Sequence, residues 1–370
     1  MVTAINNAVI HTGTEKIENK VLLIENHQVV GWQDEAPSNA TLLDAAGKNL
    51  SPAFIDIQPN GGYDLYFTRE VSEFALDDMY QASTDHGTGY ILPTLITSEH
   101  TTIIKAIDIV KKYREKQPGV LGMHLEGPFL NVEKRGAHPA NIIRQPTDEE
   151  LRKIIDVGRD VIKIITIAPE NFTDYQLDML LDSGINISLG HTMINYEQAQ
   201  YYFSKGIRLV THLFNAMTQM GHRDPGLVGA VFDNEAVYAP LILDGGHCHY
   251  AAARIALKQK GDKLILLSDA AFLGRKKQRF DWENLSIQMV DGYYRDASGN
   301  LGGAAISMVD AIRNAVLHLE VTLEEAVRMA TSKVARAIGL EDQLGFIRPG
   351  YDARFALFND DLSEYEYWEL

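Results

Sequence analysis

Short apolar runs alternate with longer segments of helical periodicity from about residue 53 to residue 268. Segments with apolar residues at three-to-four spacing include 98–116, 148–157, 196–204 and 250–260. An eightfold strand–helix alternation is typical of a closed (β/α)8 barrel, which has about 250 residues before insertions. We therefore predict an α/β fold with a TIM barrel over residues 53–339. Its strands are expected at 54–58, 89–94, 120–125, 161–167, 185–189, 208–212, 238–243 and 264–268.

The two ends of the chain have a different pattern. Residues 1–52 show no helical period, and their short β-type runs lie at 8–10, 20–25 and 28–32. Asn26-His27 offers a turn between the last two runs. Residues 354–358 again resemble a strand, and we expect this strand to return to the N-terminal ones. Residues 1–52 and 340–370 are therefore predicted to form a small β-sandwich domain.

The alternation breaks after the eighth predicted strand. Asp291-Gly292 is a strong signal for a two-residue hairpin turn within the β-type residues 285–294. We predict a β-hairpin insertion near 275–300. A helix is then expected from about Ala304, and a final helix over 323–338.

Charge and hydropathy exclude several classes of partner. The net charge of −16 repels nucleic acid and anionic membranes. The longest apolar runs, such as 161–167, are much shorter than the roughly 20 residues of a membrane-spanning helix, and the N-terminus lacks the pattern of a signal peptide. Cys248 is the single cysteine, so no internal disulfide can form. We expect a cytoplasmic protein that binds neither nucleic acid nor a membrane.

Motifs of several other enzyme classes are absent from the sequence. It contains no Gly-x-Gly-x-x-Gly after a strand, no phosphate-binding loop, no His-Glu-x-x-His and no Gly-x-Ser-x-Gly. Nucleotide cofactors and a serine nucleophile are therefore not expected. The basic run Arg275–Arg279 stands out in this acidic chain. A solvated surface loop is the favoured interpretation of the run, with phosphate steering as the functional alternative.

Four predicted strands are followed by a single polar or ionisable side chain. The segments are His-Leu-Glu-Gly-Pro (124–128), Leu-Gly-His-Thr (189–192), Thr-His-Leu-Phe-Asn-Ala-Met (211–217) and Leu-Leu-Ser-Asp-Ala (266–270). Taken singly, such residues are more often structural hydrogen bonders, but barrel enzymes build their sites at this rim. We predict Glu126, His191 and His212 as the protein ligands of a divalent metal ion. Two nitrogens and one oxygen suit zinc, with iron, manganese or cobalt as alternatives.

Three further ionisable residues are candidates for the chemistry. Asp269 is the first choice for general base and acid, because a carboxylate beside the metal site can accept a proton from water and return it to a departing nitrogen. A turn cap is the structural alternative for Asp269. His138 and His247 lie in glycine-containing loops after the third and seventh strands. The residues alone leave four roles open for these two histidines: a metal ligand, an oxyanion partner, a hydrogen-bond partner of the substrate, or a surface residue.

An anion site is expected near the metal site. The loop after the sixth strand contains the candidate substrate-binding residues Asn215, Ala216, His222 and Arg223. The planar guanidinium of Arg223 suits a phosphate or carboxylate, although a salt bridge to Asp224 is an alternative. Barrel phosphate sites more often use the last two loops, which favours Gly302-Gly303 instead. The residues alone leave this choice open.

The four segments, together with Pro52-Ala53-Phe54-Ile55-Asp56, resemble the amidohydrolase superfamily and, within it, the N-acetylglucosamine-6-phosphate deacetylases. The resemblance extends from about residue 45 to about residue 352. Glu-Gly-Pro-Phe and His-Leu-Phe-Asn-Ala-Met are specific to these deacetylases, whereas Pro-Gly-Tyr-Asp-Ala (349–353) is shared by many amidohydrolases. The resemblance implies hydrolysis of N-acetyl-D-glucosamine 6-phosphate to D-glucosamine 6-phosphate and acetate in amino sugar catabolism.

The resemblance also implies roles for individual residues. Glu126, His191 and His212 would bind the metal ion, and Asp269 would be the general base and acid. His138 would assist at the acetamide carbonyl, and His247 would hold a sugar hydroxyl. The 6-phosphate would be bound by Asn215, the Ala216 backbone and Arg223. Arg223, with His222 as a helper, would reach in from the second subunit of a homodimer.

Two departures from the wider superfamily are visible. Many members end the first strand with His-x-His, which holds a second ion, whereas this chain has Gln58-Pro59-Asn60. Neutral amides are poor zinc ligands, so we expect one ion per chain. Ser51-Pro52-Ala53 replaces the usual Pro-Gly and does not concern the chemistry. Alternative functions are a deacetylase of another amino sugar phosphate such as the galactosamine epimer, a cyclic-amide hydrolase, and a non-catalytic sugar-phosphate-binding barrel.

Overall fold

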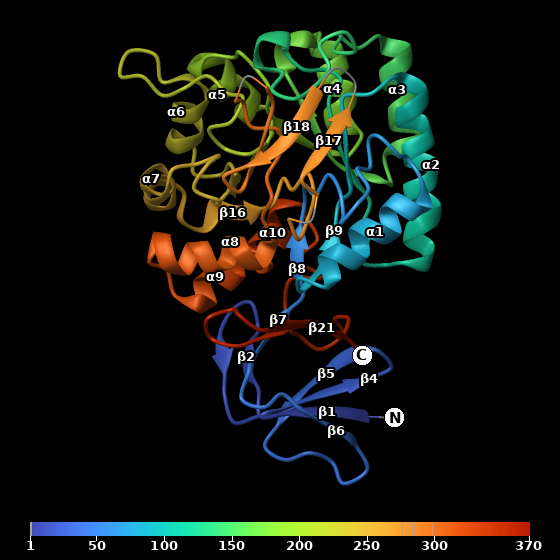
Figure 1. Cartoon of the computed structure of the whole chain (residues 1–370), viewed down its shortest axis with the longest axis vertical. Coiled ribbons are helices and arrows are strands. Elements are labelled where there is room, and N and C mark those ends of the chain that lie inside the picture. The colour runs from blue at the N-terminus through green and yellow to red at the C-terminus, as the bar shows by residue number, and fades with distance from the viewer. Residues whose placement is uncertain (1, 276, 283–284, 298) are drawn as a thin grey trace.

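The structure is a computed structural model that describes residues 2–275, 277–282, 285–297 and 299–370. A large part built from strands and helices lies above a smaller part built from strands, and both chain termini lie in the smaller part (Figure 1). Strand β8 (Phe54–Asp56) leaves the smaller part and points into the larger one. Its carboxyl end, and with it the rim where a barrel enzyme builds its site, therefore faces away from the chain termini.

All eight predicted barrel strands are present. They are β8, β9 (Thr88–Ile91), β11 (Met123–Glu126), β12 (Ile162–Ile167), β13 (Asn186–Leu189), β14 (Leu209–Val210), β15 (Ala239–Ile242) and β16 (Leu264–Leu267). A short additional strand, β10 (Thr94–Ile96), follows β9 and pairs with β11. Every pairing among these strands is parallel, and single bridges join Ile91 to Val120 and Leu209 to Tyr238 where the ladders are interrupted.

The first and eighth barrel strands are joined by side-chain hydrogen bonds. The backbone N–H of Ser268 donates to Asp56 Oδ1 at 3.2 Å, and the Ser268 hydroxyl donates to Asp56 Oδ2. Asp56 is fully buried, and burial raises the pKa of its carboxyl although these hydrogen bonds favour the charged form. The contact places Ser268, which directly follows β16, beside the end of β8.

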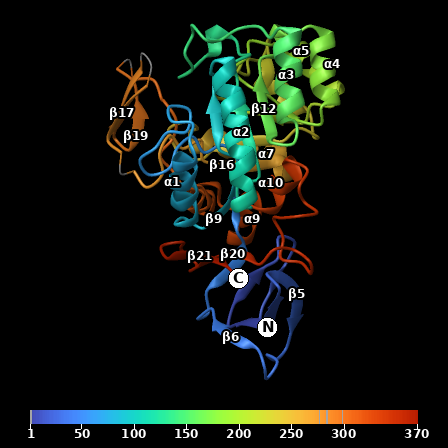
Figure 2. The same cartoon turned by 90° about the vertical axis from the view of Figure 1, so that its right-hand side faces the viewer.

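Helices cover the outside of the barrel, and Figure 2 shows α2, α3 and α4 standing side by side along one flank. The helices before the hairpin are α1 (Glu73–Thr84), α2 (His100–Lys116), α3 (Asp148–Gly158), α4 (Asp174–Asp182), α5 (Tyr196–Ser204), α6 (Gly226–Asp233) and α7 (Tyr250–Lys260). Their starts follow local chemistry. Thr173 and Asn195, for example, form capping boxes with the glutamines three residues later.

Two helix predictions near the C-terminus were wrong in their bounds. Helix α8 (Met308–Asn314) begins four residues after Ala304, because Ser307 caps it and Ala304 instead forms a parallel bridge to Ala270. The predicted helix over 323–338 is two helices, α9 (Leu323–Met329) and α10 (Ser332–Ala337). The helix is interrupted at Ala330, whose carbonyl accepts a hydrogen bond from Ile55 of β8. A tertiary contact with the barrel thus replaces a helical one.

Strands from both chain ends share a sheet in the smaller part. One sheet has the order β5-β4-β1-β6 and the other β21-β20-β7-β2-β3. The strands are β1 (Val2–Asn6), β2 (Val9–His11), β3 (Lys16–Ile17), β4 (Val21–Glu25), β5 (Gln28–Gln33), β6 (Thr41–Asp44), β7 (Asn49–Pro52), β20 (Arg354–Phe358) and β21 (Tyr365–Glu369). Strand β20 pairs with β7, as expected for a C-terminal strand that returns to the N-terminal ones. The two sheets share one apolar cluster of buried side chains, which includes Ile10, Leu22, Leu50 and Phe355.

The insertion after β16 is a three-stranded antiparallel sheet. Its strands are β17 (Arg279–Trp282), β18 (Leu285–Val290) and β19 (Tyr293–Arg295). Asp291 and Gly292 connect β18 to β19 with φ angles of 51° and 84°, the left-handed values that a two-residue hairpin turn requires. This confirms the predicted hairpin. Figure 2 shows the sheet on one side of the barrel, at the end far from the chain termini.

Candidate active site

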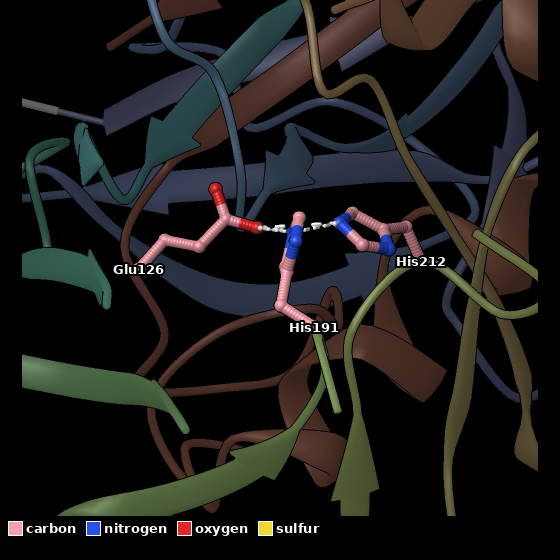
Figure 3. A group of neighbouring side chains, drawn as sticks. All are labelled: Glu126, His191 and His212. Atoms are coloured by element: carbon pink, nitrogen blue, oxygen red, sulfur yellow. Dashed lines mark hydrogen bonds and ion pairs between the residues drawn. The ribbon is translucent and has the colours of Figure 1, made fainter. Parts of the chain in front are cut away.

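Three buried side chains converge at the carboxyl ends of three strands of one parallel sheet. Glu126 is the last residue of β11, and His191 and His212 each follow two residues after β13 and β14. Glu126 Oε1 lies 3.2 Å from Nε2 of each histidine, and the two Nε2 atoms are 3.1 Å apart. Figure 3 shows the three side chains pointing toward one another. The predicted metal ligands therefore share one site.

The backbone at this rim adopts conformations that L-residues rarely take. His191, His212 and Asp269 have φ angles of 50°, 31° and 47°. Such left-handed residues cost about 1 to 3 kcal/mol each and persist where the surrounding structure enforces them.

The donor set fits a divalent metal ion. His191 Nδ1 lies 2.7 Å from the carbonyl oxygen of Lys134, so this nitrogen carries the proton and leaves the Nε2 lone pair directed at the site. The two imidazole nitrogens and the carboxylate oxygen lie within 4.8 Å of one another. Burial opposes ionisation of Glu126, but the neighbouring imidazoles of His191 and His212 more than offset it and hold the pKa of Glu126 well below its usual range. The site thus holds a buried carboxylate that a cation would neutralise.

Asp269 lies at the same rim, two residues after β16. Its Oδ1 accepts hydrogen bonds from Asn60 Nδ2 at 2.8 Å and Gln58 Nε2 at 3.3 Å. Burial and the nearby charge of Glu126 raise the pKa of Asp269 to about 7. A carboxyl group with a pKa near neutrality can both accept and release a proton, which suits a general base and acid.

His138 faces Glu126 from the loop after β11. Its Nδ1 accepts from the backbone N–H of Thr97 at 3.4 Å and lies 2.8 Å from the Thr97 hydroxyl. The ring proton therefore lies on Nε2, which is 3.7 Å from Glu126 Oε2. Burial lowers the pKa of His138 to about 3, so the ring is a neutral hydrogen-bond donor. The sequence contained no signal for Thr97, because it follows β10 and is distant in sequence from His138.

His247 is held by a local hydrogen bond. Its Nδ1 lies 2.7 Å from Asp244 Oδ2, and the backbone N–H of His247 donates to Asp244 Oδ1 at 2.8 Å. Burial raises the pKa of Asp244, but the hydrogen bonds from His247 outweigh it and the net shift is downward. Because Nδ1 donates to Asp244, Nε2 is the nitrogen available to a ligand. The Asp-x-x-His spacing in the sequence was a usable signal for this pair.

One cavity of about 200 Å³ connects these groups. Its wall includes Glu126, His191, His212, His138, Asp269, His247, Asn215, Ala216 and Gly303. The cavity therefore brings together nine of the eleven predicted site residues. His222 and Arg223 are exposed and do not line it.

The loop with His222 and Arg223 extends away from the body just before α6 (Figure 1). Within the described part of the chain, neither side chain makes a hydrogen bond or an ion pair, and the alternative salt bridge from Arg223 to Asp224 is not formed. At the other phosphate candidate, the N–H of Gly302 already donates to the Tyr294 carbonyl at 3.0 Å. Gly302 therefore has no free backbone donor for an anion.

The described members of the basic run contact other groups of the protein. Arg275 Nε donates to the Ala305 carbonyl at 3.0 Å, and Arg279 pairs with Asp281 at 3.2 Å. Lys277 lies 3.9 Å from Asp64. Lys276 lies outside the described residues. The described members of the run do not line the central cavity.

An apolar part of the cavity wall was missed by the sequence analysis. Tyr66, Ile96, Phe280 and Ile287 line it, and they belong to one buried cluster. Phe280 and Ile287 come from the hairpin insertion, and Tyr66 from the loop after β8. These segments meet only in three dimensions, since they are separated by more of the chain than any local pattern covers.

Comparison with known proteins extends over nearly the whole chain. A model described as the Amidohydrolase family matches residues 49–368. N-acetylglucosamine-6-phosphate deacetylase of Haemophilus influenzae is 36% identical over 362 residues, which are 96% of this chain and 94% of that protein. N-acetylgalactosamine-6-phosphate deacetylase of a Shewanella species is 37% identical over 326 residues, covering 86% of this chain and 81% of that protein.

Solved structures agree with the sequence matches. N-acetylglucosamine-6-phosphate deacetylase from Pasteurella multocida has a TM-score of 0.93 and 34% identity, covering 98% of this chain and 96% of that one. A mutant of the Mycobacterium smegmatis enzyme in complex with N-acetyl-D-glucosamine-6-phosphate has a TM-score of 0.88 and 27% identity, with 98% and 96% covered. Within the described residues, no helix combines the length and the hydropathy needed to span a membrane.

Proposed function

Because the chain belongs to the amidohydrolase family, we propose that it hydrolyses N-acetyl-D-glucosamine 6-phosphate to D-glucosamine 6-phosphate and acetate, in amino sugar catabolism. The observation that carries this proposal is the single cavity in which a three-ligand metal site, a carboxyl group with a pKa of about 7 and two oriented histidines meet. This set of groups provides everything that hydrolysis of an amide requires. It also argues against a non-catalytic sugar-phosphate-binding barrel.

The proposed mechanism assigns a role to each polar group. Glu126, His191 and His212 would hold a divalent metal ion, which when bound would supply a Lewis acid for the amide carbonyl and for water. Asp269 accepts the proton of the attacking water and then donates it to the sugar nitrogen as the C–N bond breaks. His138 donates from Nε2 to the carbonyl oxygen, where negative charge develops.

We propose one metal ion per chain, with zinc as the first choice and iron, manganese or cobalt as alternatives. Gln58 and Asn60 occupy the positions where other superfamily members have a histidine pair. Their amide nitrogens donate to Glu126 and Asp269. As oriented, these side chains act as donors to carboxylates and not as metal ligands.

We propose that the sugar lies on the side of the cavity formed by His247, Asn215, the Ala216 backbone and Gly303. The 6-phosphate would be bound by Asn215, by the Ala216 backbone and by Arg223 of the second subunit in a homodimer, with His222 as a helper. The exposure of this loop, and the absence of a partner for Arg223 within the described part of its own chain, support the proposal.

A galactosamine epimer is the second candidate substrate, because N-acetylgalactosamine-6-phosphate deacetylases are among the relatives. Acetate release should be measured with N-acetylglucosamine and N-acetylgalactosamine, each with and without the 6-phosphate, and with a cyclic amide. We expect the highest kcat/KM for N-acetyl-D-glucosamine 6-phosphate. A higher kcat/KM for the galacto compound would make N-acetyl-D-galactosamine 6-phosphate the substrate. Hydrolysis of the cyclic amide alone would overturn the proposal.

We further propose that residues 1–52 and 340–370 form a β-sandwich domain beside a barrel domain of residues 53–339. The shared sheet of β20 and β7 and the apolar cluster between the two sheets support this division. A cytoplasmic location likewise remains a proposal. Limited proteolysis that releases the barrel as a stable fragment would test the division.

A further inference from the structure

The hairpin insertion contributes a paired apolar surface to the cavity. Phe280 of β17 and Ile287 of β18 are direct cross-strand partners, so their side chains lie on the same face of the hairpin. Both are buried and both line the cavity. Phe280 stacks on Tyr66 with ring centroids 5.5 Å apart, which fixes the hairpin against the loop after β8. The pair is therefore a packed part of the wall.

This surface lies close to the proposed general base. Ile287 packs on Gly302, where an added Cβ would come within 2.7 Å of Ile287 Cδ1. The next residue, Gly303, lies over the Asp269 backbone, because a Cβ there would be 3.4 Å from the Asp269 carbonyl oxygen. The Ala304 N–H donates to that same carbonyl at 2.8 Å. Ile287 is thus connected through Gly302 and Gly303 to the backbone of Asp269.

The geometry of an amide then leaves one direction for its acyl chain. In the proposed mechanism the carbonyl oxygen faces the metal site and His138, and the nitrogen faces the sugar, on the side of His247 and Asn215. The third substituent of the carbonyl carbon must point away from both. The rest of the cavity wall is largely apolar. It includes Ile242, Leu301 and the one clustered group formed by Tyr66, Ile96, Phe280 and Ile287.

We propose that Phe280 and Ile287 form the wall against which the acyl group of the substrate packs, and that they limit its length to acetyl. The proposal rests on the proposed deacetylase function and adds the determinant of acyl specificity. Burial of the acetyl methyl group against an apolar wall is favourable, whereas a longer acyl chain would clash with the side chains of the wall. One methylene in an apolar pocket changes kcat/KM by about 10- to 200-fold, which is a measurable effect.

The test uses D-glucosamine 6-phosphate acylated on nitrogen with formyl, acetyl, propanoyl or butanoyl groups. We expect the metal-loaded wild-type protein to prefer acetyl over butanoyl. Ile287→Ala removes three carbons from the wall and should raise the butanoyl-to-acetyl ratio of kcat/KM by about tenfold or more. Phe280→Ala should act in the same direction. The ratio is informative because a general loss of stability lowers both rates together.

Met289→Ala is the matched control. Met289 lies two residues from Ile287 on β18, so it is on the same face, and it packs against the same apolar cluster without lining the cavity. Its replacement should leave the acyl preference unchanged. A shift as large as that of Ile287→Ala would mean that loosening the hairpin, and not the wall itself, changes the specificity, and would overturn the proposal.

Ile287→Phe provides the opposite change. A larger side chain should lower kcat/KM for acetyl while largely sparing formyl, which has no carbon beyond the carbonyl. Unchanged acyl ratios in folded Ile287→Ala and Ile287→Phe proteins that still hydrolyse the acetyl compound would refute the acyl wall but not the deacetylase function. If the wild-type protein hydrolysed no member of the series, the deacetylase function itself would be wrong.

Discussion

Asn60 Nδ2 donates a 2.8 Å hydrogen bond to Asp269 Oδ1, which links the end of the first barrel strand to the end of the eighth. The resemblance to the amidohydrolase superfamily implies a metal-binding histidine at this position in many members. In this chain an amide holds the proposed general base instead, and Gln58 assists it at 3.3 Å. Two amides at the end of the first barrel strand therefore support Asp269, at positions where we propose that no second metal ion binds.

Asp269→Asn should abolish turnover while the fold and the metal content remain. An amide of similar shape cannot accept the proton of water, and general acid–base catalysis is typically worth about 10² to 10⁴-fold in rate. Steady-state kinetics and metal analysis of the same preparation check this. Near-normal turnover in the variant would rule out Asp269 as the base.

The metal-free protein should show the raised pKa of Asp269 in its stability. Folding favours the protonated carboxyl, so wild-type stability falls as pH rises from about 4, the unfolded pKa, to about 7, the folded one. Asp269→Asn lacks this titration. The difference in Tm, variant minus wild type, should therefore increase between about pH 4 and pH 7 and be constant above about pH 8 in the presence of a chelator. A difference that does not change with pH would contradict the shift.

Thr97→Val should lower kcat by about three- to tenfold. The substitution keeps the shape of the side chain but removes the hydroxyl group beside His138 Nδ1, and a hydrogen bond contributes about 0.5 to 1.5 kcal/mol. Thr97→Ser retains the hydroxyl and is the control, with kcat close to wild type. Equal kcat values for the two variants would show that Thr97 does not position His138.

Metal analysis should find about one divalent ion per chain in active protein, and Glu126→Ala should lose it. Three buried donors form one site, and the two amides in place of a histidine pair are poor ligands. Removing the ion with a chelator should abolish activity and lower Tm, because a ligand at about 100 times its Kd stabilises the folded state by about 2.7 kcal/mol. Two tightly held ions, both needed for activity, would contradict this prediction.

Arg223→Ala should weaken the binding of the phosphorylated substrate by about ten- to hundredfold. The binding of the unphosphorylated sugar should be nearly unaffected. A charge-assisted hydrogen bond contributes about 1.5 to 3 kcal/mol. Mixing Glu126→Ala with Arg223→Ala tests whether the arginine acts across the dimer, since a hybrid would combine one intact metal site with one intact arginine. No recovery of activity despite proven subunit exchange would place the phosphate contact within one chain or at Gly302-Gly303.

The sequence by itself determined the barrel strands and the residues that end them. Strand and helix periodicities are local properties, so all eight strands were predicted, and the bounds of α5 and α7 agree with the expected ones. Parallel strands in a barrel end at one rim, so polar residues after four of them predicted one site. The Asp291-Gly292 turn was predicted for the same local reason, since it needs only two residues with positive φ.

Contacts between distant segments were decided only by the tertiary structure. The break between α9 and α10 depends on a hydrogen bond from Ile55, and the orientation of His138 depends on Thr97 of another segment. The apolar wall joins Tyr66 to Phe280 across more than two hundred residues of chain. Local patterns report which face of an element is buried, whereas the partner it meets there depends on how the whole chain packs.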